Sequence, residues 1–163
     1  MFQSFDATTS PDQGPARLTA LRGEMARLGI AAFVVPRADI HQGEYVAPRD
    51  ERLAWLTGFT GSAGFAVALA ESAAVFIDGR YTVQVRAQVD TDHFMPVDWP
   101  KTKLGPWLAE RLDETDVVGI DPWLHTRAEV EALEKAGLTV RCVANPLDAI
   151  WDDRPEAPKG AMT

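Results

Sequence analysis

Short apolar runs alternate with amphipathic segments along most of this sequence, and that alternation limits the folds open to it. The runs are bounded by Gly, Pro, Ser and Asp in the manner of strands, and they cover 30–35, 65–69, 73–77, 117–120 and 138–143. A weaker run at 93–97 contains Pro96, which confines it to an edge or a strand end. The sequence therefore predicts an α/β fold: a mixed, mostly parallel sheet of about six strands with helices on both faces.

Segments with helical spacing of apolar residues fill the intervals between these runs. They are predicted at 16–28, 50–56, 78–89, 104–112, 126–136 and 146–151. The start at Thr126 is marked by a capping box, because Glu129 stands three residues later. The runs 65–69 and 73–77 are separated by a short polar turn, so we expect a β-hairpin there.

Composition indicates one folded domain and excludes some classes of partner. The chain has 163 residues, of which 46% are hydrophobic and 25% charged, and this is enough for a core. A formal net charge of −8 makes nucleic acid a poor partner, since phosphates attract Lys and Arg. The one cysteine, Cys142, can form no internal disulfide, and its apolar surroundings predict a buried, inert thiol.

The chain divides into a polar start, a patterned middle and a short polar end. We expect residues 1–14 to be a flexible tail, residues 15–155 to be the domain, and residues 156–163 to begin a linker. No signal peptide is recognisable at the start, and no apolar run is long enough to span a membrane. These features predict a cytoplasmic protein without a membrane partner.

A glycine-rich loop follows the predicted helix at 50–56. It consists of Phe59, Thr60, Gly61, Ser62, Ala63 and Gly64, and is called the 59–64 loop below. A serine nucleophile elbow needs glycine two residues before the serine and a helix after it, whereas here Thr60 and a strand occupy those places. Two readings stay open: a self-contained turn, or a thin loop that fits against another surface.

Polar and charged residues gather in the other loops of the same region. We expect a structural polar cluster made of His41, Glu44, Asp50, Asp78 and Arg80. Arg80 stands at a helix start, where the dipole disfavours a cation, so it should pair with one of these carboxylates. A metal site here would need at least three ligands, and the three His residues of the chain are scattered. The charge run at 49–52 is typical of a solvated face.

Three segments together resemble a known family. They are PRADIHQGEYVAPRDERLAWLTGFTGSAG at 36–64, DGRYTVQVRAQVD at 78–90 and IWDDRP at 150–155. They resemble the amino-terminal domain of aminopeptidase P, within the creatinase, prolidase and aminopeptidase P family, and the resemblance spans about 16–155. The sequence departs from the family pattern at Gly43, at Arg49 and at Phe76-Ile77, which affects the subfamily more than the family.

The resemblance implies a parent enzyme that removes an amino-terminal residue preceding proline. Two divalent metal ions, usually Mn²⁺, would be held by a separate carboxy-terminal catalytic domain through two Asp, a His and two Glu. The present chain would then contain no catalytic residue, metal ligand or cofactor, and would be inactive alone. Its implied partners are that catalytic domain, a second subunit in a homodimer, and a peptide with proline in second position. The 59–64 loop would project toward an active site in the neighbouring subunit and would shape substrate access.

Two alternatives remain open at this stage. The scaffold could serve as a stand-alone module that binds a protein or peptide, since folds are reused after catalysis is lost. It could also be the equivalent domain of a prolidase or a creatinase. Whether the reading frame continues past Thr163 into a domain with metal ligands would separate the first alternative from the enzyme.

Overall fold

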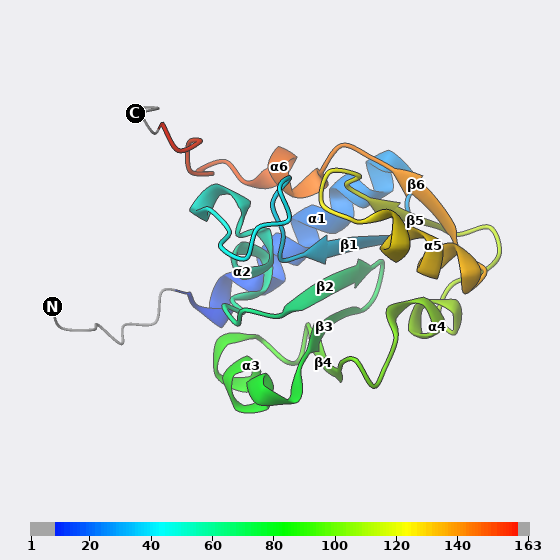
Figure 1. Ribbon diagram of the computed structural model, residues 1–163, viewed down its shortest axis with the longest axis horizontal. Coiled ribbons are helices and arrows are strands. Elements are labelled where there is room, and N and C mark those ends of the chain that lie inside the picture. Colours follow the sequence, from blue (N-terminus) through cyan, green and yellow to red (C-terminus); the bar gives the residue numbers. More distant parts are fainter. Residues whose placement is uncertain (1–8, 160–163) are drawn as a thin grey trace, which may run out of the picture.

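A six-stranded mixed sheet forms the middle layer of the structure, a computed structural model that describes residues 9–159 (Figure 1). Its order is β4-β3-β2-β1-β5-β6. The antiparallel pairs are β1–β2 and β2–β3, and the other three pairs are parallel, as the sequence predicted. The strands are β1 (Ala32–Pro36), β2 (Gly64–Leu69), β3 (Ala73–Ile77), β4 (Met95–Asp98), β5 (Val117–Ile120) and β6 (Thr139–Cys142).

Helices cover both faces of this sheet, which confirms the predicted layers. One face packs against α1 (Gly14–Leu28), α2 (Arg52–Thr57), α3 (Thr82–Gln88) and α6 (Pro146–Ile150). The other packs against α4 (Leu104–Ala109) and α5 (Arg127–Lys135). Short 3-10 turns stand before three of the helices: η1 (Pro11–Gln13), η2 (Pro48–Asp50) and η3 (Gly79–Tyr81).

The central strand β1 supplies side chains to two separate cores. Phe33 and Val35 join the core under α1 and α2, while Ala32 and Val34 join the core under α4 and α5. Side chains alternate across a strand, so a strand covered on both faces must be apolar at every position. This is why β1 appears in the sequence as an unbroken apolar run.

Local signals set the helix ends. Thr126 accepts a hydrogen bond from the Glu129 amide at 3.3 Å, and the Glu129 carboxylate accepts from the Thr126 amide at 2.6 Å, completing the predicted capping box. Gly29 ends α1 in the left-handed conformation at φ 68°, which glycine adopts without strain. The predicted tail at 1–14 falls mostly outside the described residues, but Pro11–Gln13 form η1, directly before α1. Residues 160–163 of the predicted linker also lie outside them.

The edge strand β6 corrects one expectation. Cys142 is exposed, because β6 pairs with β5 alone and three of its four residues face solvent. The apolar run at the sheet edge is therefore not buried in the core. The prediction of a buried Cys142 thiol is wrong, and the thiol is accessible to solvent. No helix in the described part of the chain is long and apolar enough to cross a bilayer.

Candidate functional site

The 59–64 loop is anchored at its beginning by the last turn of α2. The Thr57 hydroxyl donates to the Leu53 carbonyl at 2.7 Å and accepts from the Phe59 amide at 3.1 Å. The chain then turns at Gly58, whose φ of 87° and close approach to the Gln88 carbonyl leave no space for a side chain. These contacts direct the Phe59 ring into the core, where it is 1% exposed.

The middle of the loop closes over that ring. A Cβ added to Gly61 would lie 2.3 Å from Phe59 Cζ, so only glycine fits here with the ring in place. Gly61 is buried, whereas the neighbouring Thr60 and Ser62 are exposed and Ala63 is half-buried. The loop is thin because its backbone lies directly on an aromatic side chain of its own domain.

The exposed part of the loop is bonded to η3 and α3. Thr60 donates its amide to Gln88 Oε1 at 3.0 Å and accepts from Gln88 Nε2 at 2.7 Å. The Ser62 hydroxyl lies 2.5 Å from the Tyr81 hydroxyl, and this hydrogen bond lowers the pKa of Tyr81. Tyr81 also packs edge-on against Phe59 at 5.5 Å. The loop therefore has a fixed shape before any partner arrives.

Asp78 and Arg80 form the ion pair that the sequence predicted. The Asp78 carboxylate accepts from the Arg80 amide at 2.9 Å and from Arg80 Nε at 3.1 Å. Hydrogen bonds from the Arg80 amide and guanidinium lower the pKa of Asp78. The guanidinium lies over the Tyr81 ring at 5.4 Å and its side chain is 69% exposed, so the pair borders the 59–64 loop on the surface.

The other members of the predicted polar cluster lie elsewhere. His41 and Glu44 are exposed in the 37–47 loop, which joins β1 to η2. Across residues 9–159, neither forms a hydrogen bond or ion pair with Arg80, and the same is true of Asp50. The structure thus brings Asp78 and Arg80 together but does not place the five residues in one cluster.

Asp50 belongs to a second ion-pair group. Arg52 donates from Nε and a terminal nitrogen to the two Asp148 oxygens at 2.7 and 3.1 Å, and reaches Asp50 at 3.3 Å. Arg154 pairs with Asp148 at 3.0 Å and with Asp50 at 3.3 Å. We call these four residues the exit clamp, because they tie α2 to α6 and to the chain leaving it.

The exit clamp corrects the expectation of a solvated charge run at 49–52. Arg52 is only 5% exposed. Burial acts to lower its pKa, but the hydrogen bonds to Asp148 together with the negative charges of Asp148, Asp50 and Asp121 raise it. No local sequence signal indicates this pairing, since its partners are 96 residues apart.

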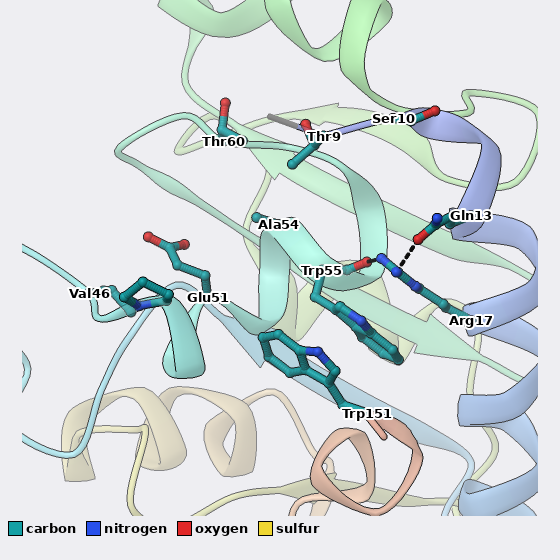
Figure 2. A pocket seen from close by; sticks show the side chains of 11 residues that line it. Thr9, Ser10, Gln13, Arg17, Val46, Glu51, Ala54, Trp55, Thr60 and Trp151 are labelled. Atoms are coloured by element: carbon teal, nitrogen blue, oxygen red, sulfur yellow. Dashed lines mark hydrogen bonds between the residues drawn. The ribbon is translucent and has the colours of Figure 1, made fainter. Parts of the chain in front are cut away.

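A hollow of about 760 Å³, absent from the sequence predictions, lies next to these features (Figure 2). Trp55 of α2 and Trp151 stack with their rings 5.2 Å apart and form one wall. Arg17 of α1 lies over the Trp55 ring at 4.4 Å and donates to the Trp55 carbonyl. Thr60 reaches the opposite rim, so the 59–64 loop borders the hollow.

Chemically, the hollow is an aromatic surface with a charged rim. Burial raises the pKa of Glu51, an effect that the nearby Arg37 cation opposes. Stacked indoles suit an apolar or planar group, and the rim offers both a cation and a carboxylate. Within residues 9–159, no three His, Cys, Asp or Glu side chains are placed to hold a metal ion. The resemblance assigns the implied metal ions to a separate carboxy-terminal domain and not to this chain.

Comparison with known proteins shows the same family from sequence and from structure. Residues 17–149 match the Creatinase/Prolidase N-terminal domain family. A probable Xaa-Pro aminopeptidase P of Arthroderma otae is 35% identical over 98% of this chain and 27% of its own length. Human Xaa-Pro aminopeptidase 2 is 36% identical over 86% of this chain and 22% of its own.

The fold agrees with a solved relative. The crystal structure of an X-prolyl aminopeptidase from Caenorhabditis elegans, described as a cytosolic enzyme with a di-nuclear active site, superposes with a TM-score of 0.80 and 30% identity. The match covers 88% of this chain and 26% of that one. The chain thus spans about a quarter of the length of these relatives. By sequence match and by fold, it belongs to the creatinase/prolidase N-terminal domain family, in the form found in Xaa-Pro aminopeptidases.

Proposed function

We propose that this chain is the non-catalytic amino-terminal domain of a metal-dependent Xaa-Pro aminopeptidase. The observation that carries the proposal is one of coverage: relatives of that name match nearly the whole chain, yet the chain matches only 27% and 22% of their lengths. The remaining length leaves room for a carboxy-terminal catalytic domain. The parent enzyme would remove an amino-terminal residue that precedes proline.

The metal chemistry would belong to that catalytic domain. A di-nuclear site is described for the C. elegans relative, and we assign two divalent ions, Mn²⁺ by resemblance, to the parent enzyme. A cytoplasmic location and a homodimer complete the proposal, the first supported by the description of that relative as cytosolic. This chain would contribute binding surface and shape rather than ligands.

The test of activity compares the full-length parent protein with the isolated 163-residue chain. Both are assayed with an Xaa-Pro peptide and added Mn²⁺. We expect metal-dependent release of the first residue by the full-length protein and none by the isolated chain, because hydrolysis needs fixed ligands and an open metal position. Turnover by the isolated chain that persists after removal of contaminants contradicts the proposal, as does an inactive full-length protein.

The 59–64 loop would line the substrate end of the active site at a subunit or domain boundary. Thr60 borders the hollow and is held by Gln88 of α3, while Ser62 is held by Tyr81, so the exposed residues of the loop present a preformed edge. Ser62→Trp in the full-length protein adds bulk without touching the core. We expect a raised KM or a lowered kcat.

Two control variants separate bulk from other effects. Ser62→Ala removes the hydrogen bond to Tyr81 without adding volume. Ser72→Trp places the same bulk on an exposed serine in the β2–β3 turn, at the other end of β2. If folded Ser62→Trp and Ser72→Trp proteins have the same KM and kcat, the loop does not line the active site and is only a turn of its own domain.

A stand-alone peptide-binding module is the second candidate, and the hollow favours it. An open aromatic wall formed by Trp55 and Trp151 is typical of sites for apolar peptide groups. The two candidates differ in the gene: a reading frame that stops at Thr163 supports the module, and one that continues into metal ligands supports the enzyme.

A further inference from the structure

We propose that the end of the domain formed by the 37–47 loop and the hollow beside it is the surface on which the polypeptide that follows residue 163 packs. We call this end the exit face. The inference rests on the proposed function in one respect, namely that the chain continues into a further domain. It goes beyond that function by naming the contact surface and its chemistry.

The first observation is where the chain leaves the domain. Arg154 donates from Nε to the Arg49 carbonyl at 2.8 Å and pairs with Asp50 and Asp148. Arg49 and Asp50 belong to η2, which directly follows the 37–47 loop. Residues beyond 154 therefore start beside this loop, and Figure 1 shows the cyan loop region and the red C-terminal segment at the same end of the molecule.

The second observation is that the 37–47 loop has a defined shape without contacts from a partner. The Asp39 carboxylate accepts hydrogen bonds from the His41 amide at 2.8 Å and the Gly43 amide at 3.1 Å. These bonds lower the pKa of Asp39, the Gly43 bond contributing most. Arg37 donates to the Glu44 carbonyl at 3.2 Å and so ties the end of the loop to its beginning. A loop held in this way loses little entropy on docking.

The third observation is what this ordered loop presents. Ile40 is 59% exposed and Tyr45 is 87% exposed. These are two of the five large exposed apolar residues in the described chain, and they stand five positions apart. Val46 follows them and lines the hollow with Trp55. Apolar side chains held outward on a fixed backbone indicate a contact surface.

The occupant that fits is the downstream part of the same polypeptide. The chain that leads to it is held beside the 37–47 loop at Arg154 by the exit clamp, so the downstream part meets the exit face at a high effective concentration. Its contacting surface would be apolar, to cover Ile40 and enter the hollow, and would offer a hydrogen-bond acceptor to the Tyr45 hydroxyl. A second copy of the chain would have no such tether.

Amide hydrogen exchange on the full-length protein and on the isolated chain tests this inference. We expect amides in 38–47 to exchange at least about tenfold more slowly in the full-length protein. The Ile40→Ser, Tyr45→Ser double variant should remove that difference. Val83→Ser is the matched control, since Val83 is 83% exposed on α3 and belongs neither to the 37–47 loop nor to the residues that line the hollow. Unchanged exchange in β1 to β3 verifies that each variant is folded.

Two results would overturn the inference. One is equal exchange of 38–47 in both proteins. The other is protection that develops in the isolated chain as its concentration rises, which would assign the surface to a second copy. The peptidase assay is read separately. If the full-length protein hydrolyses the Xaa-Pro peptide but amides 38–47 exchange equally in both proteins, only the docking surface is rejected. If amides 38–47 are protected in the full-length protein but the peptide is not hydrolysed, only the proposed function is rejected.

Discussion

Replacing Gly61 by alanine measures how tightly the 59–64 loop is closed over its own ring. The added Cβ would lie 2.3 Å from Phe59 Cζ and 2.9 Å from each of the two adjacent ring carbons. Carbon atoms pack best at about 3.5–4.0 Å, so the ring would have to move by more than about 1 Å. Phe59 is 1% exposed and packed against Tyr81, which leaves it little room.

This overlap sets the expected magnitude. Overpacking a filled core costs about 1–3 kcal/mol, and three close ring contacts place Gly61→Ala at about 2–3 kcal/mol. For a chain of this length the loss corresponds to a fall of about 5–10 °C in Tm. Urea unfolding of the isolated chain, followed by tryptophan fluorescence, gives the free energy of unfolding directly.

Controls isolate the contact with the ring. Gly79→Ala makes the same chemical change at a position where the new Cβ meets nothing within 4 Å. Its free energy of unfolding should stay within about 0.5 kcal/mol of that of the unsubstituted chain. Combining Gly61→Ala with Phe59→Leu should cost less than the sum of the single changes, because leucine removes the atoms that clash. If Gly61→Ala itself stays within about 0.5 kcal/mol, the reasoning about the closed loop is refuted.

Three further changes test the exit clamp, a helix cap and a buried imidazole. Asp148→Asn should lower the free energy of unfolding by about 2 kcal/mol, less than a fully buried pair because Asp148 is 34% exposed; an unchanged urea midpoint would show that Arg52 needs no such partner. Thr126→Ala removes the capping box and should cost about 1 kcal/mol, whereas Thr126→Ser should restore most of it. Burial lowers the pKa of His125 against the charges of Glu129 and Asp121, and its Nε2 is buried without a partner among the described residues. Below about pH 6.5 His125 is therefore protonated in the unfolded chain but still neutral in the folded chain. The free energy of unfolding consequently falls as the pH falls. In the His125→Gln variant the free energy of unfolding should decline less with falling pH than in the unsubstituted chain. Parallel declines in the two proteins would contradict this reasoning.

The sequence predicted what depends on near neighbours along the chain. The Thr126–Glu129 spacing, the glycine after α1 and the turn between β2 and β3 each act within a few residues, so their patterns are sufficient. The Asp78–Arg80 pair could be predicted for the same reason, since Asp78 caps the 3-10 turn η3 and Arg80 follows two residues later.

What the sequence did not predict depends on contacts between distant segments. Arg52 is in a charge run whose composition is that of a surface, and only its pairing with Asp148 of α6 explains its burial. The hollow needs Trp55 and Trp151 to meet, and a count of tryptophans does not say which of them stack. The prediction of a buried Cys142 is wrong because an apolar run does not indicate whether its strand is central or at an edge of the sheet.

The strand order has a consequence for how the domain folds. Every pairing within β4-β3-β2-β1 joins strands that are consecutive in the chain, while β1 meets β5 only through Ala32–Val118 and Phe33–Gly119. The β1–β4 half can therefore assemble through connections between consecutive strands, whereas pairing β5 with β1 must close a much longer loop. Destabilising changes in β2 or β3 should mainly slow refolding, whereas changes in β5 or β6 should mainly accelerate unfolding. On a ribosome, the first half of the sheet would be complete before the last two strands had been synthesised.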